Sequence, residues 1–327
     1  MKAIVCTKYG PPDVLRLTEV EKLVPKDNEV LIKVHAASVN YSTMALVTGK
    51  PFLIRLMGGG LLKPKIRIPG AEVAGRVEAV GNDVKQFQVG NGVFGDLSMC
   101  GRGAFAEYVS APENALALKP NNLTFEEAAA VPETALVALQ GLRDKGKIHR
   151  EQKVLINGSS GGIGTFAVQI AKSFGAEVTA VCSTRNLNLV RSLGADHVID
   201  YSKEDFTRNG QQYDLILATV GYRSFFDYRR ALSPNGIYVV TGGSLAQVFQ
   251  PALLGPFVSG SKKMTNLALR LNQEDLVFMK ELIEAGKVKP VIDRRYPLSK
   301  TAEAIKYYGE GHAQGKVVIT IEHINKT

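Results

Sequence analysis

The chain has 327 residues, of which 45% are hydrophobic and 22% charged, which excludes a disordered or fibrous protein and favours two domains. Its formal net charge of +9 favours anionic partners such as a phosphorylated cofactor, nucleic acid or an acidic membrane surface. Cys6, Cys100 and Cys182 are far apart and form no CxxC pair, which argues against a disulfide framework. The N-terminus MKAIVCTKYG has no signal-peptide core, so we expect a cytoplasmic protein.

The first 122 residues have the pattern of short strands separated by turns. Apolar or alternating runs are bounded by Gly, Pro, Asn or Asp, which predicts a compact β domain. The expected strands are 3–7, 14–20, 29–39, 72–80, 92–97 and 104–112.

From residue 123 the pattern changes to helices alternating with strands. A helix is expected over 123–142, with Thr124 as N-cap and Glu127 three residues later. The alternation that follows predicts a doubly wound parallel sheet. Its strands are expected at 153–157, 177–183, 197–201, 213–221 and 236–243, with helices at 165–175, 186–194 and 225–232.

The C-terminal third begins with an uncharged stretch, 231–261, which prolines and glycines interrupt. This punctuation predicts buried strand and loop rather than a membrane-spanning helix. Two helices, 274–286 and 301–309, and a closing strand at 316–322 are expected after it.

A glycine-rich loop follows the strand at 153–157. Gly158, Gly161 and Gly164 have a GxxGxxG spacing and open the next helix. Glycines there let the backbone approach a pyrophosphate, whose charge sits at the helix N-terminus. The alternative is a tight strand–helix turn without a ligand.

The end of the next strand indicates which dinucleotide binds. NAD sites carry an Asp or Glu there, whereas this chain has Ser183, Thr184, Arg185 and Asn186. These residues can donate hydrogen bonds to a 2′-phosphate, and Arg185 adds charge. NADPH is therefore the expected cofactor, with a solvent-facing Arg185 as the alternative.

The order of these motifs resembles the medium-chain dehydrogenase/reductase superfamily. A β-rich domain precedes AAAVPETALVALQGL, then a strand with GSSGGIG, then LGADHVIDY, as in the zinc-independent quinone oxidoreductase branch. The segments GKPFLIRLMGGGLLKPK and GHAQGKVVI resemble the chloroplast-envelope quinone oxidoreductase homologue and alkenal reductase group. The resemblance implies a chaperonin-10-like β-barrel catalytic domain (1–122 and 288–327), a Rossmann domain (123–287) and an active site in the cleft between them. We also expect a homodimer.

The resemblance also indicates whether the chain has the ligands to bind zinc. In zinc alcohol dehydrogenases PGAEVAG reads Pro-Gly-His-Glu, and the zinc-binding histidine is Ala71 here, while Asn40 replaces the first cysteine ligand. No metal site is therefore expected, and Glu72 is expected to be a structural acid that pairs with backbone or a basic group. Asn91 and Thr43 depart from the usual aspartates of the branch.

Without zinc or a Tyr-Lys pair, the chain has nothing to hold a localised alkoxide. A conjugated acceptor relaxes this demand because it spreads the charge that hydride brings. Asn40 and Tyr41 match family positions that line the cleft, and either could donate a hydrogen bond to the acceptor oxygen. Tyr41 could equally be a wall of the pocket.

The remaining cofactor contacts are implied by the resemblance and by the loop itself. Thr134 is expected near the nicotinamide and phosphates, Tyr201 near the adenosine phosphate, and the backbone of Val220 and Gly242 near the ribose and nicotinamide. Thr134 could instead bond its own helix, and Tyr201 could be a core-edge tyrosine. The other expected contacts are Ser160, Gly162 and Ile163 in the loop and Lys316 at the cofactor's rim.

The leading hypothesis is an NADPH-dependent oxidoreductase acting on quinones or α,β-unsaturated carbonyls. Enoyl-thioester reduction is a second reading, and an NADPH-binding protein that binds RNA or a membrane surface is a third. The chain lacks the aromatic–basic interleaving of single-strand binders, so no nucleic acid partner is expected. The net charge permits a peripheral membrane contact, which nothing else in the sequence supports.

Overall fold

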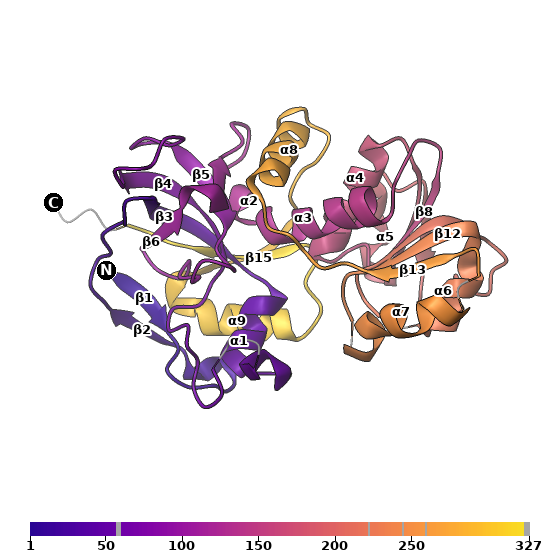
Figure 1. Cartoon of the computed structure of the whole chain (residues 1–327), viewed down its shortest axis with the longest axis horizontal. Helices are drawn as coiled ribbons and strands as arrows, with labels where there is room; N and C mark the ends of the chain where they lie inside the picture. Colours follow the sequence, from indigo (N-terminus) through magenta and orange to yellow (C-terminus); the bar gives the residue numbers. More distant parts are fainter. Residues whose placement is uncertain (57–59, 222, 244, 259, 324–327) are drawn as a thin grey trace. The chain divides into compact units, whose positions relative to one another are not determined.

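The computed structural model describes residues 1–56, 60–221, 223–243, 245–258 and 260–323 (Figure 1). Residues 57–59, within a segment that carries the family resemblance, lie outside this range. The chain divides into two compact units. The β unit comprises Met1–Glu133, Leu271–Glu284 and Pro290–Thr327, and the α/β unit comprises Thr134–Arg270 and Ala285–Lys289.

The β unit is built on a mainly antiparallel sheet with the strand order β14-β15-β3-β4-β5-β7. In addition β6 pairs with β3, β1 pairs with β2, and the β14–β15 pair is parallel. Its strands are β1 (Lys2–Val5), β2 (Arg16–Glu19), β3 (Glu29–Val39), β4 (Glu72–Val80), β5 (Gly92–Asp96), β6 (Tyr108–Pro112), β7 (Leu116–Leu118), β14 (Ile292–Pro297) and β15 (Lys316–Thr320).

Apolar side chains form the core of the β unit, among them Ile32 of β3, Val73 of β4 and Phe105, which lies between β5 and β6. The longer helices of the unit are α1 (Tyr41–Thr48), α2 (Phe125–Ala129), α8 (Gln273–Glu284) and α9 (Thr301–Gly309). Short helical turns are η1 (Pro12–Val14), η3 (Glu113–Ala115) and η6 (Leu298–Lys300).

The boundary of the β unit differs from the predicted one. Residues 123–133 and α8 belong to the β unit rather than to the α/β unit. Helix α2 packs against β3 and β4, and α8 packs against β7. The side chain of Gln273 donates to the Leu116 carbonyl at 2.7 Å, and the Asn121 amide donates to Glu284 at 2.9 Å. These packing contacts join α2 and α8 to the β unit, whereas the prediction divided the domains by their order along the chain.

The α/β unit contains a fully parallel sheet with the order β10-β9-β8-β11-β12-β13. Numbered within the unit, this is the 3-2-1-4-5-6 order of the Rossmann fold, so the predicted doubly wound sheet is confirmed. Its strands are β8 (Lys153–Asn157), β9 (Glu177–Cys182), β10 (His197–Asp200), β11 (Tyr213–Ala218), β12 (Leu232–Val240) and β13 (Lys263–Asn266).

Most helices of the α/β unit connect these strands. The connecting helices are α4 (Gly162–Ser173), α5 (Leu187–Ser192), α6 (Phe225–Ala231) and α7 (Leu245–Val258), with the turn η5 (Thr184–Asn186) before α5. Helix α3, which begins at Pro132 and ends at Gln140, and η4 (Gly141–Lys145) precede β8. The strand order reverses between β8 and β11, and Rossmann folds bind dinucleotides at the carboxyl ends of the strands at this point.

Two helix predictions need correction. The helix expected over 123–142 is divided into α2 and α3, because Pro132 cannot continue α2 and instead starts α3. The Thr124–Glu127 capping box is confirmed. The stretch 231–261, expected to be strand and loop, contains the 14-residue helix α7. Among the described residues no helix is long and apolar enough to cross a membrane.

Candidate active site

The glycine-rich loop leaves β8 in a conformation that requires glycine. Gly158 has φ +84°, and a Cβ on Gly164 would lie 2.1 Å from the carbonyl oxygen of Gly158. Gly161 is the N-cap of α4 and has no side-chain cap, so the first-turn amides of α4 suit an anion. The loop therefore fits a dinucleotide pyrophosphate.

The ends of two neighbouring strands meet this loop. The Asn157 side chain donates to the Val220 carbonyl at 3.1 Å, and Thr219 Oγ1 donates to the Gly158 carbonyl at 3.2 Å. A Cβ on Gly242 would lie 2.3 Å from the Thr219 carbonyl oxygen. Gly158, Val220 and Gly242 are thus brought together at the reversal point of the sheet, as a cofactor site there needs.

Residues 183–186, which are expected to contact the cofactor ribose, are hydrogen-bonded to the glycine-rich loop. The buried Asn186 side chain donates to Ser160 Oγ at 2.7 Å and to Ser183 Oγ at 3.2 Å. Arg185 is exposed. Thr184 differs from the expectation, because its hydroxyl hydrogen points to the Asp200 carboxylate at 2.5 Å and so is not directed outward.

The remaining predicted cofactor residues occupy different places. Gly162 and Ile163 lie in the first turn of α4, and buried Thr134 lies in the first turn of α3. Tyr201 directly follows β10 and is 54% exposed. Lys316 lies in the β unit and is 2% exposed, which differs from a position at an open rim.

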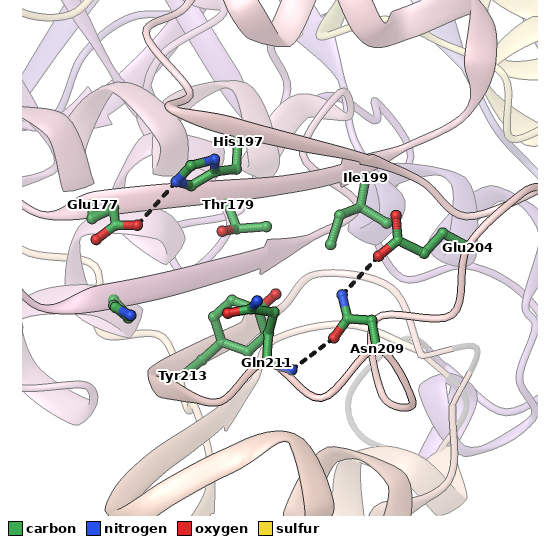
Figure 2. Close-up of a pocket in the computed structure, with 9 residues that line it drawn as sticks. Glu177, Thr179, His197, Ile199, Glu204, Asn209, Gln211 and Tyr213 are labelled. Atoms are coloured by element: carbon green, nitrogen blue, oxygen red, sulfur yellow. Dashed lines mark hydrogen bonds and ion pairs between the residues drawn. The ribbon is translucent and has the colours of Figure 1, made fainter.

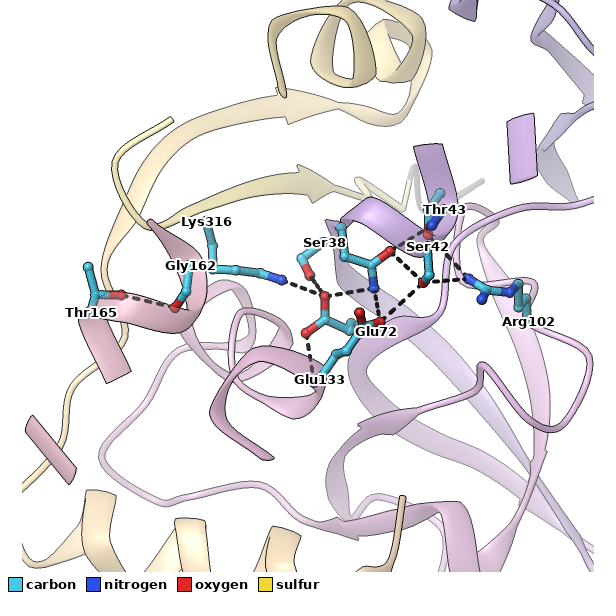
Figure 3. Close-up of polar contacts among 10 residues, drawn as sticks. Ser38, Ser42, Thr43, Glu72, Arg102, Glu133, Gly162, Thr165 and Lys316 are labelled. Carbon is cyan, nitrogen blue, oxygen red and sulfur yellow. Dashed lines mark hydrogen bonds and ion pairs between the residues drawn. The ribbon is translucent and has the colours of Figure 1, made fainter. Parts of the chain in front are cut away.

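The ammonium group of Lys316 belongs to a buried polar cluster in the β unit (Figure 3). We define this cluster as Ser38, Asn40, Ser42, Thr43, Glu72, Asp96, Arg102, Glu133 and Lys316. The sheet register assembles part of it, since Ser38 pairs with Glu72 across β3–β4 and Glu72 with Asp96 across β4–β5.

Glu72 is the centre of the polar cluster. It is fully buried and accepts hydrogen bonds from Lys316 Nζ at 2.5 Å, Ser38 Oγ at 2.6 Å and the Glu133 backbone amide at 3.0 Å. The predicted structural acid, paired with backbone and a basic group, is therefore confirmed. Its charge is compensated inside the β unit.

Asn40 has a structural role that was not predicted from the sequence. Its Oδ1 caps α1 by accepting from the Thr43 amide at 2.9 Å. Its Nδ2 donates to Glu72 at 3.2 Å and to Glu133 at 2.5 Å. An amide nitrogen has two hydrogens, so both are directed at carboxylates. This disagrees with Asn40 as a free donor to an acceptor and assigns it to positioning the two acids.

Glu133 was not identified from sequence. Burial first, then the nearby carboxylates of Glu72 and Asp96, raise the pKa of Glu133 to about 8. Lys316 and Arg102 oppose this rise. Ser42 Oγ donates to the same Glu133 oxygen at 3.2 Å. A proline inside the predicted helix, directly before Glu133, was the signal that a helix N-terminus and its acid lie here.

Arg102 was also missed. It is 9% exposed, has φ +63°, and its guanidinium donates to Ser42 Oγ at 3.3 Å and Thr43 Oγ1 at 3.4 Å. A non-glycine residue at positive φ carries backbone strain, which a surrounding network must offset. Thr43, the departure from the family aspartate, is thus an acceptor for this arginine.

Tyr41 begins α1 and is 54% exposed. Its backbone hydrogen-bonds Tyr308, whose phenol pKa is raised by burial and by Glu133 and Glu72. Tyr308 therefore stays neutral. The exposed Tyr41 ring suits either role predicted for it.

A separate pocket of about 280 Å³ lies in the α/β unit (Figure 2). Lys153, Glu177, His197 and Tyr213 line it, and each is the first residue of its strand. The pocket therefore lies at the amino ends of the parallel strands, opposite the edge where dinucleotides bind. His197 Nε2 and Glu177 Oε1 are 3.0 Å apart across it.

In the part of the chain that the structure describes, no group of three or more His, Cys, Asp or Glu side chains could hold a metal ion. Asn40 and Ala71, which the sequence resemblance aligns with two zinc ligands of the zinc alcohol dehydrogenases, are both buried.

Comparisons with family models match both units. Residues 26–121 match the alcohol dehydrogenase GroES-like domain, and residues 193–319 match the zinc-binding dehydrogenase domain. The quinone oxidoreductase structure from Coxiella burnetii superposes with a TM-score of 0.87 at 29% identity, covering 98% of this chain and 99% of that one.

Three curated relatives align with 98% of this chain. They are the chloroplast envelope quinone oxidoreductase homologue of Arabidopsis thaliana (34% identical, 98% of its length), the human mitochondrial NAD(P)H oxidoreductase RTN4IP1 (34%, 89%) and the 2-methylene-furan-3-one reductase of Solanum lycopersicum (37%, 79%). With the fold and motifs above, these matches show that the chain is an oxidoreductase of the medium-chain dehydrogenase/reductase superfamily, similar to its quinone oxidoreductases and alkenal reductases.

Proposed function

We propose that this protein is a zinc-independent, NADPH-dependent oxidoreductase that reduces quinones or α,β-unsaturated carbonyls. The observation that carries the proposal is the polar cluster of the β unit. The positions of two zinc ligands hold Asn40 and Ala71, and the glutamate beside them is already neutralised by Lys316. Among the described residues of the cluster, Lys316 is paired with Glu72 and Arg102 interacts with Asp96 and Glu133, so neither cation is in excess of the carboxyl groups.

The cofactor is held by the α/β unit in this proposal. Gly158, Gly161 and Gly164 let the pyrophosphate approach the N-terminus of α4. Bound there, NADPH supplies the hydride. The relative named an NAD(P)H oxidoreductase supports a nicotinamide cofactor, and the choice of NADPH rests on Ser183 and the exposed Arg185.

The β unit supplies the environment of the acceptor. In a conjugated acceptor, hydride adds at a carbon remote from the oxygen, and the charge spreads onto that oxygen. A neutral hydrogen-bond donor is then sufficient. Tyr41, exposed at the start of α1, is the donor we propose, and Asn40 positions the acids behind it.

The names of the relatives support the proposed class of acceptor. One is named a quinone oxidoreductase homologue, and another a reductase of 2-methylene-furan-3-one, which is a conjugated ketone. Enoyl thioesters are activated in the same way. A panel of quinones, enones and enoyl thioesters, assayed for NADPH oxidation, separates these classes, and we expect turnover with the first two.

The same preparation tests the remaining proposals. Metal analysis of the purified protein should find no stoichiometric zinc, and activity should survive chelation. Light scattering should give the mass of a homodimer. We retain the proposal of a cytoplasmic protein, which fractionation of its host cells tests. Nucleic acid added to the assay should leave turnover unchanged, whereas inhibition would favour the alternative of a binding protein.

A further inference from the structure

We propose that the Glu133 carboxyl stores the proton that the reduced acceptor takes up, and passes it on through the hydroxyl of Ser42. This inference rests on the proposed function and adds the source of the proton, which hydride transfer does not provide. Neither Tyr41 nor a bulk water molecule is then the primary source.

The contacts around Glu133 form a short relay. Its Oε2 receives the Asn40 amide at 2.5 Å and the Ser42 hydroxyl at 3.2 Å. The same hydroxyl lies 3.0 Å from Asn40 Oδ1 and accepts from Arg102 at 3.3 Å. Ser42 is half-buried. Its oxygen is therefore held beside Glu133 by groups from three separate segments, and its hydrogen can change partner.

Charge balance within the polar cluster calls for one stored proton. The carboxyls are Glu72 on β4, Asp96 at the end of β5 and Glu133 at the start of α3. The cations are Lys316 on β15 and Arg102 in the segment that follows β5. Three carboxylates against two cations would leave an uncompensated buried charge, which is costly. One bound proton makes the cluster neutral.

The charged groups that face Glu133 from other elements have a net effect that favours its protonated form. Glu72 and Asp96 disfavour its ionised form, and Lys316 and Arg102 oppose them with a smaller effect than burial has. Tyr308 on α9 stays neutral because burial and these acids raise its phenol pKa.

Glu133 rather than Asp96 is the store that can be used. Burial and Glu72 also raise the pKa of Asp96, but Asp96 is 4% exposed. Its carboxylate accepts a hydrogen bond from the Ser98 backbone amide at 2.7 Å, and no hydrogen bond between Asp96 and Ser42 is described. Glu133 contacts the Ser42 hydroxyl at 3.2 Å, and Ser42 is half-buried, so the serine connects this carboxyl to the outside of the cluster.

The step balances without a further reactant. Hydride addition to an enone leaves an enolate with one extra electron pair. For the transfer, the Ser42 hydrogen turns from Glu133 toward the acceptor and the protonated Glu133 carboxyl becomes the donor to Ser42 Oγ. The electron pair of the enolate then takes the Ser42 hydrogen, while the serine oxygen takes the proton of the Glu133 carboxyl. The O–H bond of Ser42 is broken and re-formed, Glu133 becomes a carboxylate, and water then returns its proton. With a quinone the product is the hydroquinone.

The first experiment locates the proton without using activity. Infrared difference spectra between pH 6 and pH 10 should show a protonated-carboxyl band in the wild type that titrates near 8. The band should vanish in Glu133→Gln and remain in Asp96→Asn and in Glu281→Gln, a control at an exposed glutamate of α8. A band that disappears in Asp96→Asn and remains in Glu133→Gln would overturn the assignment.

The second experiment asks whether the stored proton is used. Wild-type kcat with an enone should fall as pH rises through about 8, because Glu133 loses its proton. Glu133→Gln should lose this limb and be slower below pH 8 by roughly a hundredfold, as for loss of a general acid. KM for NADPH should be unchanged. A Glu133→Gln profile that parallels the wild type would overturn the relay.

Ser42→Ala separates storage of the proton at Glu133 from its transfer by Ser42. The same variant tests the relay if Glu133→Gln does not fold. It should keep the infrared band and a single cooperative thermal unfolding transition but lower kcat at least tenfold. Full activity in Ser42→Ala would exclude the serine as the carrier. If the wild type reduces no conjugated acceptor, the proposed function fails, whereas an active wild type with unaffected variants contradicts only the relay.

Discussion

Glu72 and Glu133 share the side-chain amide of Asn40, which donates to one at 3.2 Å and to the other at 2.5 Å. Three segments far apart in the chain meet at this point: the end of β3, the start of β4 and the start of α3. Lys316 neutralises Glu72, so Glu133 is the acid that retains its proton.

The raised pKa of Glu133 predicts how stability depends on pH. A free glutamate titrates near ~4.3, and Glu133 in the folded protein near 8. Between these values the folded state binds more protons, so this group lowers the free energy of unfolding as pH rises from about 4.5 to 8. Glu133→Gln should therefore gain stability relative to the wild type at pH 8.5 compared with pH 5.

Urea unfolding of both proteins at the two pH values checks this prediction. The Glu281→Gln control should show no such pH-dependent difference. If the free energies of unfolding of wild type and Glu133→Gln differ by the same amount at pH 5 and pH 8.5, Glu133 is ionised across the whole range.

The ion pair of Lys316 and Glu72 should be strongly stabilising against removal of one partner. Lys316 is 2% exposed, so Lys316→Met leaves an uncompensated buried carboxylate, and we expect a loss of about 3–5 kcal/mol. Lys300→Met, which breaks an exposed pair with Glu303, should cost about 1 kcal/mol or less. Chemical denaturation measures both, and similar losses in the two variants would contradict the burial argument.

Two glycines of the loop should respond differently to alanine. At Gly164 the new Cβ would lie 2.1 Å from the Gly158 oxygen, so Gly164→Ala should lower the melting temperature. At Gly161 the nearest atom is 3.7 Å away, so Gly161→Ala should fold normally but bind NADPH more weakly if the pyrophosphate lies against it. Thermal unfolding and cofactor titration test the pair. Unchanged cofactor affinity in Gly161→Ala would place the pyrophosphate elsewhere.

The cofactor preference should depend on Arg185. Arg185→Ala should raise KM for NADPH roughly tenfold and leave NADH use nearly unchanged, because only the 2′-phosphate needs the added charge. Arg191→Ala, at an exposed position on α5, is the matched control and should change neither constant. An equal response of both cofactors to Arg185→Ala would remove this arginine from the phosphate site.

Patterns that reflect backbone geometry were predictable from sequence. The glycine spacing after β8 and the strand–helix alternation gave the sheet and its loop, because each depends on local residues. Glu72 was expected to be a structural acid because the family resemblance places it beside a zinc-ligand position that Ala71 fills here. Its partner Lys316, 244 positions away, was not identified, since sheet register alone brings β15 beside β3.

Other features depended on tertiary context. Helix α7 contains Pro251, and β14 contains Arg294 and Arg295, so local propensity argued against both elements. The role of Asn40 was misassigned because an asparagine in ASVNYS can be an outward donor or an inward N-cap. Only the positions of Glu72 and Glu133 decide between them.

The central claim is that this site reduces conjugated acceptors because Asn40 and Ala71 leave it without the zinc that would stabilise a localised alkoxide. The most direct measurement compares NADPH oxidation with cyclohexenone and with cyclohexanone, which differ only in the conjugated double bond. We expect steady turnover with cyclohexenone and none above background with cyclohexanone. Comparable rates with the two ketones would contradict the account.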